Sequence, residues 1–218
     1  MARGYELIVF DWDGTLMDSA AAIVRSIQAA CRDLGVCEPE DARARHVIGL
    51  GLHDALAHAV PDLAAERYSE LAQRYRHHYL SRDHELALFD GMYDLIEELA
   101  GVGVLLAVAT GKSRLGLGRA LEQSGLGAYF HATRCADECH SKPHPAMLLE
   151  LMEELAVPPE RTLMIGDTLH DLQMAGNAGV AALAVAYGAH SRDVLAQGGA
   201  LDCVDTPGEL VAWLRQGR

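Results

Sequence analysis

The chain has 218 residues, half of them hydrophobic, and a formal net charge of −13. This length suits one large domain or one domain with a substantial insertion, and the hydrophobic content is enough for a core without disulfides. The acidic charge, with no cluster of Lys and Arg to offset it, argues against nucleic acid as a partner. An anionic substrate would need a local positive site, which a bound metal and one lysine could supply.

Five cysteines at irregular spacing favour reduced thiols in a cytoplasmic protein over a secreted disulfide framework. The first apolar run is too short for a signal peptide, and no stretch reaches the ~18 apolar residues of a membrane span. We therefore expect a cytoplasmic protein with no membrane partner, of an oligomeric state that the sequence does not indicate. A Cys/His cluster is formed by Cys135, Cys139, His140 and His144. Its spacing is too compressed for a single loop to surround a tetrahedral ion, so we do not expect it to bind zinc.

Four short apolar runs predict strands at residues 6–10, 104–109, 162–165 and 181–185. They are continuously apolar, as in strands that are covered on both faces of a parallel sheet. Helical patterns follow at residues 94–100, 113–123, 143–155, 169–178 and 207–215. The alternation of strand and helix predicts an α/β fold with a doubly wound parallel sheet.

Residues 16–86 interrupt this alternation. They contain no convincing strand, and apolar residues recur at helical spacing, as at Ile23, Ile27, Cys31 and Leu34. An insertion after the first strand lies above the carboxyl edge of the sheet, where α/β proteins bind ligands. We expect an α-helical cap domain, residues 16–86, over a core domain made of residues 1–15 and 87–218.

Polar residues follow the first two predicted strands. Asp11 and Asp13 can share a metal or divide the roles of nucleophile and acid/base, although Asp and Gly after a strand are also ordinary turn formers. At Thr110 and Gly111, a hydroxyl and backbone N–H groups can hold a phosphate oxygen. The following Lys112 does not make this a P-loop, because position 106 lacks the glycine that the motif needs.

Two further polar segments complete the set. Lys142 precedes Pro143 and a predicted helix, and both its charge and the helix dipole favour an anion there. Asp167 follows the third predicted strand, and Asp171 lies four residues later on the same helical face. Each segment alone could have an ordinary structural role, such as a solvated surface lysine or a helix N-cap. Together they are expected to meet at one edge of the sheet.

In this order the four segments resemble those of the haloacid dehalogenase superfamily, and most closely its phosphoglycolate phosphatases, which carry a helical cap after the first strand. The matching segments are residues 10–19 (FDWDGTLMDS), 110–111 (TG), 142–143 (KP) and 166–171 (GDTLHD). The resemblance implies a Rossmann-like core and a magnesium-dependent phosphatase. Such an enzyme hydrolyses a small phosphate monoester through an aspartyl-phosphate.

The resemblance also assigns roles to the carboxylates. Asp11 corresponds to the nucleophile, and Asp13 to the general acid that protonates the leaving alcohol and then activates water. Mg²⁺ would be held by Asp11, the main-chain carbonyl of Asp13 and Asp167, because it prefers oxygen ligands. Asp171 would orient water bound to the metal.

The remaining assignments concern the substrate. Thr110, Gly111 and Lys142 would bind the phosphoryl oxygens, and Arg45 or His46 of the cap would touch a substrate carboxylate. One such pre-placed donor is worth roughly 3 kcal/mol. From the sequence alone, Lys142→Ala is therefore expected to lower turnover about a hundredfold and to leave the fold intact.

Phosphoglycolate is the best single substrate candidate, with sugar phosphates and nucleotides left open. A β-phosphoglucomutase would carry His where this chain has Ile23, which argues against mutase chemistry without excluding it. A non-catalytic phosphate-binding protein of the same fold is a further alternative. It would be expected to lose some of the four segments, and all four are present here.

Overall fold

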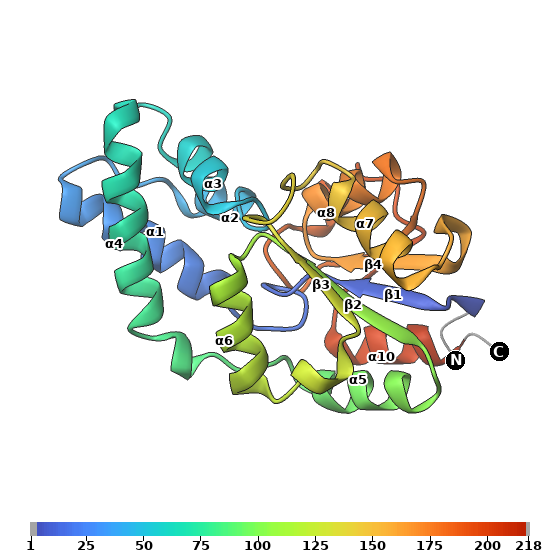
Figure 1. The fold of residues 1–218 in the computed structure, drawn as a ribbon. Coiled ribbons are helices and arrows are strands. Elements are labelled where there is room, and N and C mark those ends of the chain that lie inside the picture. The colour runs from blue at the N-terminus through green and yellow to red at the C-terminus, as the bar shows by residue number, and fades with distance from the viewer. Residues whose placement is uncertain (1–3, 217–218) are drawn as a thin grey trace.

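The computed structural model describes residues 4–216 and has a six-stranded parallel sheet at its centre (Figure 1). The strand order is β3-β2-β1-β4-β5-β6, which confirms the predicted doubly wound α/β sheet. The strands are β1 (Leu7–Phe10), β2 (Leu105–Thr110), β3 (Ala132–Cys135), β4 (Thr162–Gly166), β5 (Ala181–Val185) and β6 (Asp202–Val204).

Helices cover both faces of the sheet. They are α5 (Met92–Gly101), α6 (Arg114–Ser124), α7 (Ala146–Leu155), α8 (Leu169–Asn177), α9 (Arg192–Leu195) and α10 (Pro207–Arg215). The side chains of α5 and α10 join one apolar core with alternate residues of the strands, and those of α7 and α8 join a second core on the other face. Burial on both faces explains why the central strands are continuously apolar.

The register of the sheet brings the strand ends together. β1 pairs with both β2 and β4, so that Phe10 lies beside Val108 and Ile165. Asp11 extends this ladder by one hydrogen bond, from its N–H to the carbonyl of Ile165 (2.9 Å). The residues that follow β1, β2 and β4 therefore meet at the carboxyl edge, at the point where the strand order reverses.

The two outermost strands were not among the predicted elements. Both are short and carry polar residues, such as Arg134 in β3 and Asp202 in β6, because one side of an edge strand is open. The start of α7 also differs from the prediction, since the helix begins at Ala146 and not at residue 143. Pro145 accounts for this difference, because a proline disfavours helical geometry in the residue before it.

The insertion is helical, as predicted, and forms its own apolar core. Its helices are α1 (Ala20–Leu34), α2 (Asp41–His46), α3 (Leu52–Ala59) and α4 (Tyr68–Leu80), and they lie to one side of the sheet in Figure 1. The entering and leaving chains hydrogen bond to each other, from the N–H of Asp18 to Ala87 (3.0 Å) and from that of Phe89 to Leu16 (2.9 Å). This paired crossing lies near the predicted cap boundaries at residues 16 and 86, which stay a prediction. Within residues 4–216, no helix is long and apolar enough to cross a membrane.

Candidate active site

Three aspartates form a buried cluster at the carboxyl edge of the sheet. Asp11 follows β1, Asp167 follows β4, and Asp171 lies in the first turn of α8. Carboxylate oxygens of the three lie within 4.8 Å of one another, and none of the three residues is more than 1% exposed. The structure thus brings together residues that are up to 160 positions apart in the chain.

Local chemistry holds two of these carboxylates in place. Asp167 accepts hydrogen bonds from the Thr15 hydroxyl (2.9 Å) and from the N–H of Ala189 (2.7 Å). Gly14 lies against the same carboxylate with φ of +83°, where a side chain would collide with it. Asp171 forms a capping box with Thr168, whose N–H and hydroxyl both donate to it (3.1 and 2.6 Å). Thr168 is therefore the N-cap residue of α8, and Asp171 completes the capping box from the third helical position, in addition to its place in the cluster.

Lys142 is the cation of this cluster. Its side chain is fully buried, and Nζ lies 2.8 Å from Oδ1 of Asp11 and 2.6 Å from Oδ1 of Asp171. Burial alone would lower the pKa of this ammonium, but the two carboxylates outweigh burial and raise it. Lys142 is therefore a buried, charged group and not a solvated surface lysine.

One ammonium does not balance three buried carboxylates. Burial raises the pKa of Asp11 to about 7, although the neighbouring Lys142 lowers it in part. Burial, together with Asp11 and Asp171, raises the pKa of Asp167 well above its usual value. Oδ2 of Asp11 is buried and accepts no hydrogen bond from the described residues. The cluster therefore fits a bound cation that prefers oxygen ligands, because such an ion would supply the missing charge and occupy the free oxygen.

Asp13 belongs to a separate network. Its Oδ1 accepts a hydrogen bond from the Ser19 hydroxyl (2.7 Å) and lies 3.0 Å from Nζ of Lys112. The same Nζ donates to the hydroxyl of Tyr79 on the cap helix α4 (2.9 Å). The side chain of Asp13 is thus held by Ser19 and by Lys112, and Lys112 links it to Tyr79 of the cap. Sequence reasoning missed Lys112 and Tyr79, and the only signal was the position of Lys112 directly after Thr110 and Gly111.

A cavity of about 450 Å³ lies between the cap and the carboxyl edge of the sheet. Asp11, Asp13 and Thr110 lie in its wall, next to residues of α1, α3 and α4. Thr110 is the last residue of β2, and Gly111 is in contact with the cap backbone, because a side chain there would collide with the carbonyls of residues 49 and 50. Lys142 is in contact with Asp11 but is not among the lining residues.

The two cap residues named from the sequence lie elsewhere. Neither Arg45 nor His46 is among the residues that line the cavity. The backbone carbonyl of His46 accepts hydrogen bonds from Nε2 of His170 (2.8 Å) and of His190 (3.2 Å), so α2 is seated on the core. Within residues 4–216, the aspartate cluster is the one group of His, Cys, Asp and Glu whose ligand atoms all lie within 4.8 Å of one another.

Comparison with known proteins fits this geometry. The profile of the haloacid dehalogenase-like hydrolases matches residues 8–185, which is most of the chain. The chain belongs to this family. "Probable phosphatase IndB" of Dickeya dadantii is 39% identical, over 94% of this chain and 91% of that protein. The phosphoglycolate phosphatase of Aliivibrio fischeri is 32% identical, over 86% of this chain and 87% of that protein.

A solved structure shares the fold of nearly the whole chain. It is that of a Haemophilus somnus protein described as a "predicted phosphoglycolate phosphatase", with a TM-score of 0.85 and coverage of 96% and 97% of the two chains. Its sequence is 24% identical, a similarity that shows a shared fold and no shared activity. Together with the relatives, the family match confirms the prediction of a hydrolase, a phosphatase of the haloacid dehalogenase superfamily with a helical cap.

Proposed function

We propose that the chain is a Mg²⁺-dependent phosphatase that transfers the phosphoryl group of a small organic monoester first to Asp11 and then to water. The observation that carries this proposal is the buried Asp11 carboxylate. It lies between Lys142 and two further carboxylates and also borders a cavity large enough for a substrate.

Three oxygen donors would hold the ion: the carboxylates of Asp11 and Asp167 and the main-chain carbonyl of Asp13. Mg²⁺ prefers such ligands and keeps several waters, one of which Asp171 would orient. When bound, the ion would neutralise charge on the nucleophile and on the phosphoryl group.

In the first step an oxygen of Asp11 attacks phosphorus, and the bond to the ester oxygen breaks. Asp13 gives its proton to that oxygen, so that a neutral alcohol leaves. In the second step water attacks the phosphorus of the aspartyl-phosphate, Asp13 takes up a proton from the water, and the bond to Asp11 breaks. Thr110, the N–H of Gly111 and Lys142 would hold the phosphoryl oxygens during both steps.

The substrate named from the sequence is phosphoglycolate, and the phosphoglycolate phosphatase of A. fischeri among the relatives supports it. Sugar phosphates and nucleotides stay open. Arg45 and His46 would need a different placement of α2 to reach a substrate carboxylate in the cavity.

Phosphate release from a panel of monoesters, with Mg²⁺ and with EDTA, tests the proposal. We expect release that requires Mg²⁺. We also expect Mg²⁺ to raise the melting temperature, because saturation at a hundredfold of Kd stabilises a protein by about 2.7 kcal/mol. A protein that binds Mg²⁺ and phosphate but releases none from any ester would be a phosphate-binding protein and not an enzyme.

Lys112→Met is expected to lower kcat by about tenfold or more, because Asp13 would lose the ion pair that holds it in place. The loss should be larger for alkyl phosphates than for p-nitrophenyl phosphate, whose leaving group needs no proton. Steady-state kinetics with both esters measure this difference. Equal losses for the two esters would mean that Lys112 acts on something other than protonation of the leaving group.

A further inference from the structure

The cavity is much larger than a two-carbon organic group requires. Its volume of about 450 Å³ lies within the range of about 300–1,000 Å³ that small-molecule sites typically have. Glycolate adds only two carbon atoms to the phosphate and would leave most of this space unfilled. Size alone therefore suggests an organic group at least as large as a six-membered ring.

This volume is present with the cap seated on the core. The N–H of Gly51 donates to the hydroxyl of Ser141 (2.8 Å), and the backbone at residues 49–50 packs directly on Gly111. The carbonyl of His46 is held by two core histidines. Contacts at these three places close the phosphate end of the cavity, so the remaining space lies farther out, between α1, α3, α4 and the start of α6.

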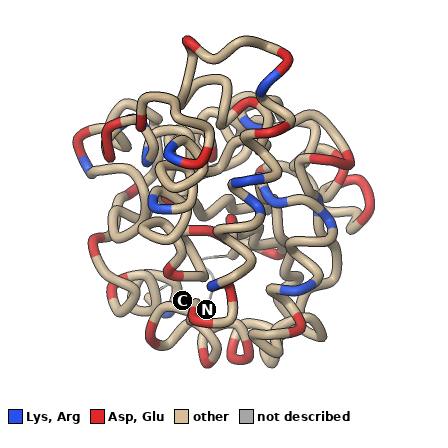
Figure 2. Tube along the Cα trace, turned by 90° about the vertical axis from the view of Figure 1, so that its left-hand side faces the viewer, with Lys and Arg blue, Asp and Glu red and all other residues tan. Residues whose placement is uncertain are grey.

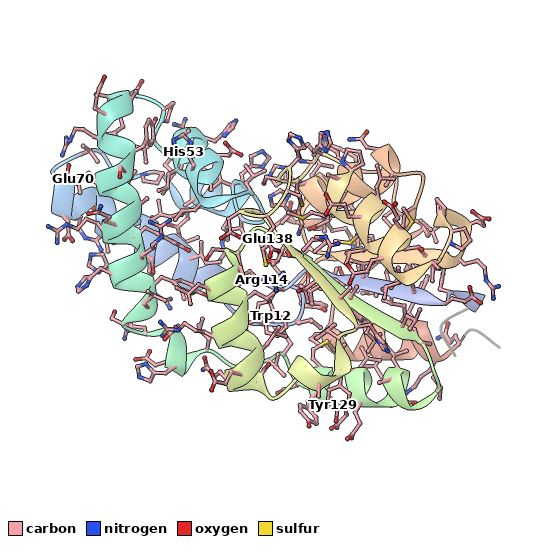
Figure 3. The ribbon with its side chains drawn as sticks, viewed as in Figure 1. Trp12, His53, Glu70, Arg114, Tyr129 and Glu138 are labelled. Carbon is pink, nitrogen blue, oxygen red and sulfur yellow. The ribbon has the colours of Figure 1, made fainter. Side chains whose placement is uncertain are left out.

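Apolar side chains dominate the cap side of that space. The main contributors come from α1, the α2–α3 loop, α3 and α4: Ile23, Ile27, Leu50, Leu52, Tyr75 and Tyr79. The two tyrosine rings stack on each other, with centroids 5.8 Å apart. Figure 3 shows His53 on cap helix α3 and Arg114 at the start of core helix α6, where the guanidinium pairs with Glu138 (2.6 Å).

The charges around the cavity do not favour a second anionic group. Four aspartates line it, Asp11, Asp13, Asp54 and Asp137. Two of the three Lys and Arg residues in the wall are already paired, Lys112 with Asp13 (3.0 Å) and Arg119 with Asp83 (2.8 Å). Acidic and basic residues are interspersed over the side of the molecule that carries the cap, without one large basic patch (Figure 2). A substrate carboxylate would therefore find little compensation beyond the exposed Arg76.

We infer that the substrate is a phosphate monoester with a ring-sized, apolar and uncharged organic group, which the cap wall around Tyr75 and Leu52 binds. This inference rests on the proposed phosphatase function and replaces phosphoglycolate as the expected substrate. Either a simple aryl-bearing alcohol or the base of a nucleoside could supply the ring, because both would present a flat, uncharged ring face to the apolar cap wall.

Five phosphate esters of primary alcohols test the size, polarity and charge of the organic group separately. Their leaving groups are all primary alcohols, so differences in leaving-group type do not affect the comparison. The five esters are benzyl phosphate, uridine 5′-monophosphate, glucose 6-phosphate, ethyl phosphate and phosphoglycolate. One methylene in a hydrophobic pocket changes kcat/KM by about 10- to 200-fold. We therefore expect one of the two ring esters, benzyl phosphate or uridine 5′-monophosphate, to be the best substrate. Its kcat/KM should exceed those of glucose 6-phosphate, ethyl phosphate and phosphoglycolate by at least about tenfold.

The other outcomes are distinct. If phosphoglycolate or ethyl phosphate is the best substrate, the inference is overturned and the phosphatase function stands. Glucose 6-phosphate as the best substrate shows a polar site and overturns the inference in the same way. No release from any of the five with Mg²⁺ overturns the proposed function as well.

A substitution in the cap wall tests whether the ring of the substrate binds in the cavity. Tyr75→Ala is expected to lower the ratio of kcat/KM between the preferred ring ester and ethyl phosphate by about tenfold, because it removes part of the apolar wall. Tyr93→Ala, at an exposed tyrosine of α5, is the matched control and should leave the ratio unchanged. An unchanged ratio in folded Tyr75→Ala would contradict the placement, and Leu52→Ala repeats the test if Tyr75→Ala does not fold.

Discussion

Asp11→Asn is expected to abolish turnover, with kcat lowered by about 10⁴-fold or more for every ester. The amide cannot form the phosphoryl-enzyme, and no other carboxylate of the cluster replaces it at the cavity wall, since Asp167 and Asp171 are not among the lining residues. Phosphate release and acid-quench labelling of the protein measure the two consequences. Asp62→Asn, at an exposed aspartate of the cap, is the control and should keep full activity.

The same substitution is expected not to destabilise the metal-free protein. Burial opposes the ionised form of Asp11 and raises its pKa to about 7, so the wild-type carboxylate stabilises the fold poorly near neutral pH when no cation is present. Lys142 keeps a partner in Asp171 (2.6 Å) after the change. Urea unfolding in EDTA should therefore give a free energy of unfolding no lower than that of the wild type. A clearly lower value would mean that the pair of Asp11 with Lys142 outweighs the burial of the carboxylate.

The central sheet and its polar strand ends could be predicted from the sequence because burial on two faces leaves a continuous apolar run. A polar residue directly after such a run, as at Asp11 or Asp167, stands out against it. The edge strands could not be found in this way. Arg134 in β3 pairs with Glu150 (2.7 Å) and Glu154 (2.7 Å) of α7, so its charge is explained only by tertiary contacts.

Contacts between cap and core could not be predicted from the sequence either, because they too are tertiary contacts between distant segments. Lys112 and Tyr79 lie 33 positions apart, and nothing in their local pattern indicates that they meet. The docking of α2 on two histidines of the core likewise decides that His46 lies away from the cavity. Local patterns predicted that a cap exists, but its seat on the core depends on pairings between separate segments.

The burial of Lys142 changes what its replacement should do. For an exposed loop lysine, replacement would be expected to leave the stability of the protein unchanged. Nζ of Lys142, however, is fully buried between Asp11 and Asp171. Removing one partner of a buried ion pair typically costs about 3–5 kcal/mol, because the remaining charge is left uncompensated. Lys142→Met, which keeps most of the side-chain volume, is therefore expected to lower the free energy of unfolding by about this amount, and turnover by about a hundredfold or more.

A double variant separates these two effects. Asp11→Asn should restore part of the stability lost in Lys142→Met, because it removes one of the two carboxylates that the lysine neutralised, while turnover stays absent. Urea unfolding of the wild type, both single variants and the double variant, all in EDTA, gives the coupling energy between the two residues. Additive losses would show that the charge of Lys142 does not act on Asp11. Wild-type turnover in Lys142→Met would remove the lysine from the proposed phosphoryl site.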